Sequence, residues 1–186
     1  MGAQPRATQT APGKSTRAVS TSFVHRRLTL VRHASAHPPQ PGLSDYDRSL
    51  SAKGRKEALA LGRRLAAKIG TPDLLVASPA KRALQTARIL AAELAYPAHR
   101  IRMETHLYEA TIADLLALIS RTSDRHRHLL ILGHNPGLTR LVGALTAQAG
   151  GTMPTASAFC LETTGTSWHE ISKHPARILF FAAPAV

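Results

Sequence analysis

The sequence predicts an α/β protein of three layers, in which helices cover both faces of a mostly parallel β-sheet. Two observations predict this fold. From Leu28 onward, short apolar segments typical of strands alternate with longer amphipathic segments typical of helices. Gly, Pro or helix-capping residues also separate these segments, so each element has a defined end. With 186 residues, the chain is long enough for one domain with a sizeable core.

Residues 1–26 differ from the rest and are predicted to be a disordered basic tail in front of a domain at 27–186. The tail is rich in Ala, Thr and Ser, and the first acidic residue of the chain is Asp45. Such a segment cannot bury enough apolar surface to fold. Its composition also overlaps with that of organelle transit peptides. We therefore expect a cytoplasmic protein, with targeting to an organelle through the tail as the alternative.

The domain is predicted to begin with a strand, a loop and a long helix. Residues 28–31 are apolar and indicate the strand, whereas residues 37–50 are rich in Pro, Gly and Asp and indicate the loop. At 52–69, apolar residues recur on one helical face, and Gly70 and Pro72 end the helix. This helix also carries six Lys and Arg residues, which form a basic, solvent-facing side.

The second strand and helix follow directly, at 73–78 and 78–95. Ser78 is expected to cap this helix, with Pro79 as its first residue. The last elements repeat the alternation and then finish with strands. Strands are predicted at 100–104, 128–133, 157–163 and 177–182, and helices at 111–120 and at 135–148 with Asn135 as the cap.

The composition limits the kinds of site that the domain can carry. Cys160 is the only cysteine, which excludes an internal disulfide and a multi-cysteine metal site, and its apolar neighbours predict a core position. Lys and Arg number 24 against 11 Asp and Glu, so we expect the protein to bind anions, either nucleic acid or a phosphorylated substrate. No apolar run approaches the roughly 18 residues that a membrane-spanning helix needs.

Basic side chains follow three of the predicted strands. Arg32 and His33 come after the first strand, Arg82 lies in the first turn of the helix after the second, and His134 follows the strand at 128–133. Ligands of open α/β sheets bind at the carboxyl ends of strands, and helical side chains lean toward the helix N-terminus. If these strands are neighbours, the four side chains share one rim with two helix N-termini.

This set of side chains suits a phosphoryl group and not a metal ion. Two arginines would repel a cation, whereas guanidinium groups bind phosphate oxygens through paired N–H donors. Cations placed around a transferring phosphoryl group stabilise the charge on its oxygens. An unprotonated histidine nitrogen can then act as the nucleophile and form a covalent intermediate. Nearby cations lower a histidine's pKa and so keep it neutral.

Three ordered motifs, "LVRHASA", "SPAKRALQTA" and "GHNPG", resemble those of the histidine phosphatase superfamily, which has the phosphoglycerate-mutase-like fold. The short length, "DYDRSLSAKGRKEA" and "LYEA" are similar to its SixA-type phosphohistidine phosphatase branch. The resemblance covers residues 28–183. It implies that His33 becomes phosphorylated, that Arg32 and Arg82 bind the phosphoryl oxygens and that His134 completes the pocket. It implies no cofactor and no metal, and it assigns Arg48 to the rim as a weaker substrate-binding candidate.

The general acid of larger family members has no clear counterpart here. Glu104 and Glu109 are the carboxylates in the corresponding region, and Glu109 is the weak candidate for this role. SixA-type proteins typically lack the acid. A phosphorylated imidazole that is protonated on its other nitrogen leaves as neutral imidazole, whereas an alkyl phosphate leaves as a basic alkoxide that needs a proton. Lack of an acid would therefore favour a phosphohistidine substrate.

Three functions are compatible with the sequence. The first is hydrolysis of phosphohistidine in a partner protein, and the second is hydrolysis of a small phosphorylated metabolite or nucleotide. The third is a non-catalytic module that binds anions or nucleic acid, but aromatic residues make up only 4%, which argues against stacking of bases. We therefore expect a phosphorylated substrate as partner and neither specific nucleic acid nor membrane. The physiological substrate and the oligomeric state stay open.

Overall fold

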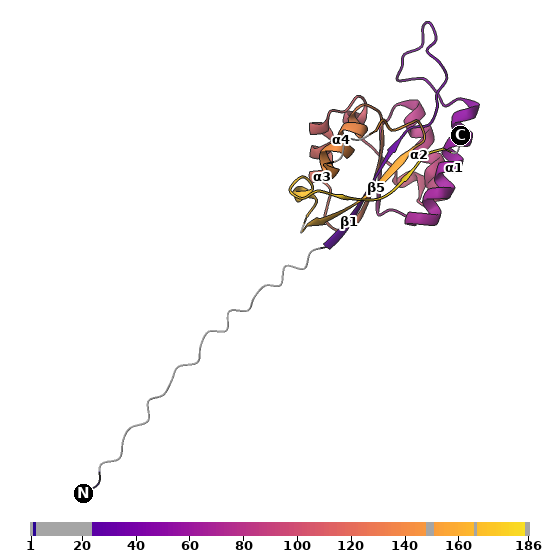
Figure 1. Cartoon of the computed structure of the whole chain (residues 1–186). Coiled ribbons are helices and arrows are strands. Elements are labelled where there is room, and N and C mark those ends of the chain that lie inside the picture. Colours follow the sequence, from indigo (N-terminus) through magenta and orange to yellow (C-terminus); the bar gives the residue numbers. More distant parts are fainter. Residues whose placement is uncertain (1, 3–23, 148–150, 166, 185–186) are drawn as a thin grey trace.

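The computed structural model describes residues 2, 24–147, 151–165 and 167–184 and has the predicted three-layer architecture (Figure 1). Six strands form one sheet in the order β3-β2-β4-β1-β5-β6. The strands are β1 (Val24–Arg32), β2 (Leu74–Ala77), β3 (Arg102–Met103), β4 (His128–Gly133), β5 (Ala158–Gly165) and β6 (Arg177–Ala182). The α-helices are α1 (Ala52–Ile69), α2 (Lys81–Glu93), α3 (Ile112–Ser120) and α4 (Gly137–Thr146), with short 3-10 helices at Ala98–Arg100, Thr105–Leu107 and Trp168–Glu170.

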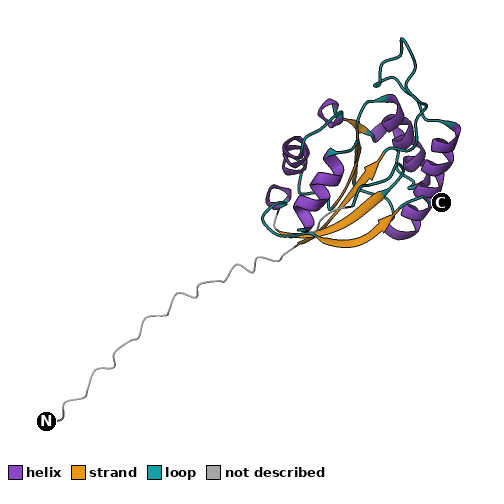
Figure 2. Ribbon diagram, turned by 45° about the horizontal axis from the view of Figure 1, so that its top comes forward, coloured by secondary structure: helices purple, strands orange, loops and turns teal. Residues whose placement is uncertain are grey.

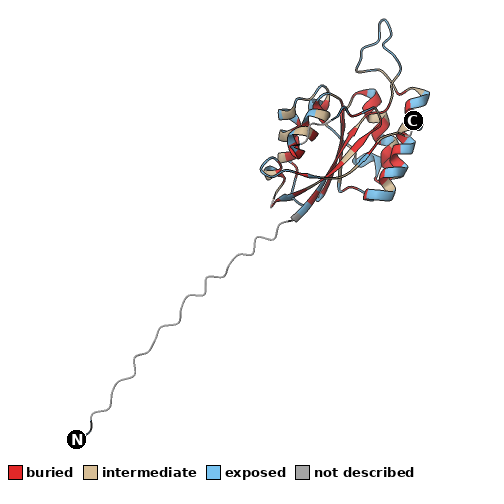
Figure 3. Cartoon of the chain, in the orientation of Figure 1, coloured by how far each residue is buried: buried red, intermediate tan, exposed pale blue. Residues whose placement is uncertain are grey.

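The sheet is mostly parallel, as predicted. Strands β1 to β4 pair with one another in parallel, and only β5 runs against its two neighbours. Helices α1 and α2 cover one face of the sheet, and α3 and α4 cover the other (Figures 1 and 2). Each face has its own apolar core, and the middle of the sheet is buried between them (Figure 3). Strand β4 is buried along its whole length.

The first strand begins earlier than predicted. The sequence assigned residues 1–26 to a tail, but β1 starts at Val24, which pairs with Gly165 of β5. Arg26 is buried, stacks on Trp168 and forms an ion pair of 3.1 Å with Asp124. Basic residues at the start of the strand therefore have specific partners, which composition alone does not reveal. The rest of the predicted tail, apart from residue 2, lies outside the described residues.

Both predicted caps of the helices near the rim are wrong. Helix α2 begins at Lys81 after Ala80, and α4 begins at Gly137 after Pro136, each without a side-chain cap. Ser78 instead accepts a hydrogen bond from the Ala80 amide, so the chain makes a short turn before the helix begins. The strand predicted at 100–104 is shorter and spans only Arg102–Met103. Among the described residues, no helix combines the length and the apolar character needed to cross a membrane.

Candidate active site

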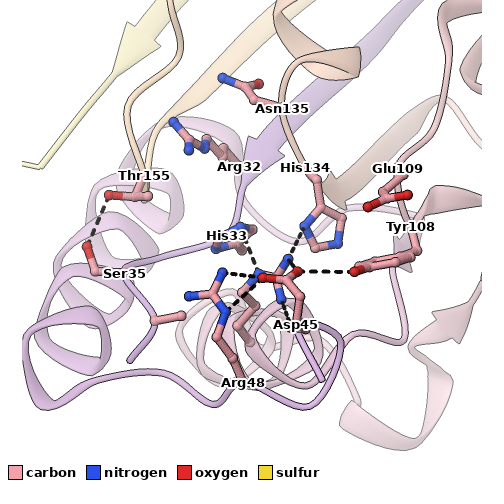
Figure 4. Close-up of a pocket in the computed structure, with 12 residues that line it drawn as sticks. Arg32, His33, Ser35, Asp45, Arg48, Tyr108, Glu109, His134, Asn135 and Thr155 are labelled. Carbon is pink, nitrogen blue, oxygen red and sulfur yellow. Dashed lines mark hydrogen bonds and ion pairs between the residues drawn. The ribbon is translucent and has the colours of Figure 1, made fainter. Parts of the chain in front are cut away.

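The candidate site is a pocket of about 450 Å³ at the carboxyl ends of β1, β2 and β4 (Figure 4). Strands β1 and β4 pair in parallel up to their last residues, Arg32 and Gly133, and β2 pairs with β4 up to Ala77. The residues that follow β1 and β4, His33 and His134, therefore emerge at the same edge of the sheet. Their ring centroids lie 5.0 Å apart. All of the predicted site residues line this pocket, namely Arg32, His33, Arg48, Arg82, Glu109 and His134.

The loop after β1 is held against the first turns of α1. The carbonyl oxygen of Ser35 accepts hydrogen bonds from the amide and the hydroxyl of Ser51, the N-cap of α1. Glu57 accepts a hydrogen bond from the Ser35 amide. A Cβ at Gly54 would lie 1.8 Å from the Ser35 carbonyl oxygen, so only glycine allows this contact. The backbone beside His33 is consequently fixed by the helix.

His33 has an unprotonated Nε2 in this arrangement. Its Nδ1 lies 2.8 Å from the carbonyl oxygen of Ala34, so Nδ1 carries the proton and donates it. The Nε group of Arg82 can only donate, and it lies 3.1 Å from Nε2 of His33. Burial lowers the pKa of His33 to about 4, and the charges of Arg82 and Arg32 act in the same direction. The ring is therefore a neutral base that lines the pocket, and its Nε2 lone pair accepts the hydrogen bond from Arg82.

Arg82 connects most of the polar groups of the site. It lies in the first turn of α2, and its side chain is buried. Besides the bond to His33, its Nη2 group lies 2.7 Å from Oδ2 of Asp45 and 3.4 Å from Nδ1 of His134. Its Nη1 group donates to the carbonyl oxygen of Asp45. All three guanidinium nitrogens are thus directed at groups of the pocket.

Arg32 has spare hydrogen-bonding capacity. Its Nη1 group donates to the carbonyl oxygen of Met153 over 2.6 Å, which anchors the side chain to the segment before β5. Its Nε atom is buried and has no hydrogen-bond partner within the part of the chain that the structure describes. A buried donor without a partner is costly. An anion in the pocket would therefore be a favourable neighbour for this guanidinium.

His134 is neutral and is oriented from the opposite side. Its Nε2 lies 2.8 Å from Oγ of Ser78, and its Nδ1 faces a guanidinium nitrogen of Arg82, so Nε2 carries the proton. Burial lowers its pKa to about 3, and the nearby His33 and Arg82 add to this effect. The Ser78 that was predicted to cap a helix instead orients this imidazole.

Arg48 and Glu109 lie at the mouth of the pocket. Arg48 donates to the carbonyl oxygen of His37 and to Asp45. Glu109 is exposed and has a positive φ of 55°, which is strained for a residue other than glycine. Glu104, the other carboxylate considered for the role of acid, binds Arg102 and His106 and does not line the pocket. The role of each predicted site residue stays a prediction.

Asp45 and Tyr108 are two site residues that the sequence reasoning did not identify. The Asp45 carboxylate lies between Arg48 and Tyr108 in Figure 4 and accepts hydrogen bonds from both, as well as from Arg82. Burial alone would raise its pKa, but the hydrogen bonds from the two arginines lower the pKa to about 2. The signal available in the sequence was Asp45 as the first acidic residue of the chain, three residues before Arg48. Tyr108 packs edge-on against His134, with ring centroids 5.4 Å apart.

Cys160 and His128 lie outside the pocket. Cys160 is fully buried in β5, which confirms the predicted core position. His128 is buried at the start of β4 and lies 2.9 Å from the Thr29 hydroxyl. Within the described part of the chain, His, Cys, Asp and Glu side chains do not form a group of three or more that could hold a metal ion.

Comparisons with known proteins agree with this geometry. Residues 28–128 match the histidine phosphatase superfamily (branch 1). The uncharacterized protein Rv1276c of Mycobacterium tuberculosis is 32% identical over 120 residues, which are 64% of this chain and 72% of that protein. The structure of a putative phosphohistidine phosphatase SixA from Nakamurella multipartitia has a TM-score of 0.74 at 24% identity. The match covers 88% of this chain and 98% of the SixA chain. The structure of mycobacterial glucosyl-3-phosphoglycerate phosphatase in complex with VO3 has a TM-score of 0.65 at 20% identity. The match covers 85% of this chain and 99% of that phosphatase. The chain therefore belongs to the histidine phosphatase superfamily and is a phosphatase of the histidine type.

Proposed function

We propose that this protein removes phosphoryl groups from phosphohistidine in a partner protein, with His33 as the nucleophile. The observation that carries this proposal is the Nε2 atom of His33. It is unprotonated, accepts a hydrogen bond from Nε of Arg82 over 3.1 Å and belongs to a residue that lines the pocket, while the bond from Nδ1 to Ala34 fixes the tautomer. A nucleophile needs this protonation state and orientation before the substrate arrives.

The reaction would proceed in two displacements at phosphorus. Nε2 of His33 attacks the phosphorus atom, the bond to the leaving nitrogen breaks, and the phosphoryl group is carried by His33. Water then attacks the same phosphorus atom, the bond to Nε2 breaks, and inorganic phosphate leaves. Arg82 and Arg32 would hold the phosphoryl oxygens through both steps, because their guanidinium groups flank His33.

His134 would change its protonation state when the phosphoryl group binds. Its pKa is low because it is buried among positive charges. A dianion beside the ring would favour the charged form and raise this pKa. Protonated His134 could then donate a hydrogen bond to a phosphoryl oxygen while it keeps its bond to Ser78.

The choice of phosphohistidine follows from the proton needs of the leaving group. Asp45 is held as a carboxylate by Arg48 and Arg82, so it has no proton to give in this arrangement. Glu109 is an exposed residue at the rim. If neither carboxylate supplies a proton, the site favours a leaving group that departs neutral, as an imidazole does. The structural similarity to the putative phosphohistidine phosphatase SixA from Nakamurella multipartitia supports the same choice.

The experiment is phosphate release by the purified full chain from a phosphohistidine-bearing protein and from an aryl phosphate. We expect turnover of the phosphohistidine, weaker aryl phosphatase activity, and loss of both in His33→Ala. Turnover of aryl or small-molecule phosphates alone would keep the nucleophile and assign a small phosphorylated metabolite as substrate. Phosphate release that does not depend on His33 would refute the mechanism.

The role of Glu109 is tested with Glu109→Gln. If Glu109 supplied a proton, hydrolysis of an alkyl phosphate would fall far more than hydrolysis of phosphohistidine, because only the alkoxide needs the proton. We expect both substrates to be affected equally. A selective loss of alkyl phosphate hydrolysis would assign the acid to Glu109 and remove the argument for phosphohistidine.

A further inference from the structure

We propose that Asp45 is a specificity-determining residue. In the free protein its carboxylate occupies the anion site, and only a phosphoryl dianion displaces it. This inference rests on the proposed function, because it concerns the same guanidinium donors. The loop between Ala36 and Leu50 carries Asp45 into the pocket. Its carboxylate takes the place of a substrate anion there.

The contacts of the Asp45 carboxylate are those expected of a bound anion. Oδ1 lies 2.6 Å and 2.8 Å from two guanidinium nitrogens of Arg48, so both nitrogens donate to the same oxygen. Oδ2 lies 2.7 Å from Arg82 and 3.1 Å from the hydroxyl of Tyr108. Four donors from three separate segments of the chain therefore converge on one carboxylate (Figure 4).

The same donors are needed to bind a phosphoryl group next to His33. Arg82 donates from Nε to His33 and from Nη2 to Asp45, so a phosphoryl oxygen near the nucleophile competes with the carboxylate for this guanidinium. Two anions sharing these donors would repel each other. Substrate binding therefore requires that the Asp45 carboxylate withdraw from Arg82.

Withdrawal is open to the side chain because Asp45 lies at the pocket mouth. Its side chain is 48% exposed, whereas that of Arg82 is only 6% exposed. The backbone on either side is separately anchored, since the carbonyl oxygens of Asp45 and Tyr46 accept hydrogen bonds from Arg82 and from the amide of Lys81. A change of rotamer can thus move the carboxylate into water while the loop stays in place.

The consequence is discrimination between anions. A phosphoryl dianion has three oxygens and two charges, and its binding to the arginines offsets the loss of the Asp45 contacts. A phosphodiester or a carboxylate has one charge and gains little over the anion that it must displace. Asp45 therefore acts as a repulsive element against weak anions, which is a general way to build specificity.

The test is Asp45→Asn, with Asp47→Asn as the matched control. Asparagine keeps the size of the side chain and removes its charge, and Asp47 lies in the same loop but binds Ser44 outside the pocket. Calorimetry would give the dissociation constants of inorganic phosphate and of dimethyl phosphate, a monoanion. We expect Asp45→Asn to bind both more tightly, the monoanion by about tenfold or more, so that selectivity falls. The control should bind like the parent protein.

The sign of the effect separates this inference from a structural role. If Asp45 only orients Arg48 and Arg82, its replacement will weaken phosphate binding, and that result or unchanged binding overturns the inference. Unfolding curves of both variants identify any loss of folded protein. Failure of the proposed function gives a different result. The parent protein would then show no His33-dependent phosphate release, whatever the anion affinities of the Asp45 and Asp47 variants.

Discussion

Acidification tests whether His33 is held as a neutral nucleophile. Burial and the charges of Arg82 and Arg32 lower its pKa from 6.5 to about 4. That difference corresponds to roughly 3 kcal/mol in favour of the neutral ring. At pH 5, a histidine with a pKa of about 4 is roughly 90% neutral, whereas an ordinary one is roughly 3% neutral. The structure therefore predicts about thirtyfold more competent nucleophile at pH 5 than an exposed histidine would provide.

The assay combines ring NMR with kinetics. Titration of ¹⁵N-histidine-labelled protein, with His33→Gln for assignment, reports the pKa and the tautomer without a substrate. We expect the neutral ring to carry its proton on Nδ1 and to titrate near pH 4. The acid limb of kcat/KM should contain the same ionisation in addition to that of the substrate phosphoryl group at about pH 6, because kcat/KM reports ionisation of the free protein and of the free substrate. Titration near pH 6.5, or a proton on Nε2, would refute this account of the nucleophile.

Protein stability should follow the same ionisation. The folded-state pKa of His33 lies below the unfolded value, so the unfolded chain binds more protons between pH 6.5 and about 4. The free energy of unfolding therefore falls as the pH is lowered through this window, by up to about 3 kcal/mol from this residue. Urea unfolding of the parent and of His33→Gln across the window would measure the difference in slope.

Three further predictions concern the supporting structure. A Cβ at Gly137 would lie 2.2 Å from the carbonyl oxygen of Ala110, so Gly137→Ala should displace the turn that carries Tyr108. Urea unfolding should show a loss of stability of about 1–3 kcal/mol, and calorimetry should show weaker phosphate binding. Thr111→Ala removes the capping box of α3 and should cost about 1 kcal/mol in urea unfolding with kcat unchanged. Cys160 is fully buried with a raised thiol pKa, so alkylation should be slow in the native protein and fast in denaturant; rapid native alkylation would contradict its placement.

The fold was largely predictable because its elements depend on local patterns. Apolar runs bounded by Gly and Pro indicate β1, β2 and β4. The rule that ligands bind at strand carboxyl ends predicts that Arg32, His33 and His134 lie close together. What the pattern could not supply was strand direction. An apolar segment such as β5 has the same composition whether it runs parallel or antiparallel to its neighbours, and only the pairing with β1 decides this.

The errors concern polar residues whose partners are distant in sequence. Ser78 before a helix is a plausible cap, but its hydroxyl lies 2.8 Å from His134, 56 positions away. Arg26 resembles a tail residue until its ion pair with Asp124 is seen. Asp45 in a loop rich in Pro and Gly resembles a turn residue. It binds Arg48 three positions away in the same loop, but it also binds Arg82 of α2, 37 positions away. Local propensity carries no information about such contacts.

The charge arrangement explains why two histidines can serve a phosphoryl site without being charged in advance. The arginines supply permanent positive charge, because a guanidinium stays protonated across the working pH range. Burial holds the pKa values of His33 and His134 low, and the arginine charges add to this effect, so both imidazoles are neutral. In the proposed mechanism one neutral ring attacks and the other takes up a proton when a dianion arrives. Histidines charged in advance would bind phosphate as well, but the nucleophile would then have no lone pair. If His33 is the nucleophile as proposed, the separation of permanent positive charge on the arginines from the lone pair on the imidazole allows the pocket to cleave a bond to phosphorus as well as to bind an anion.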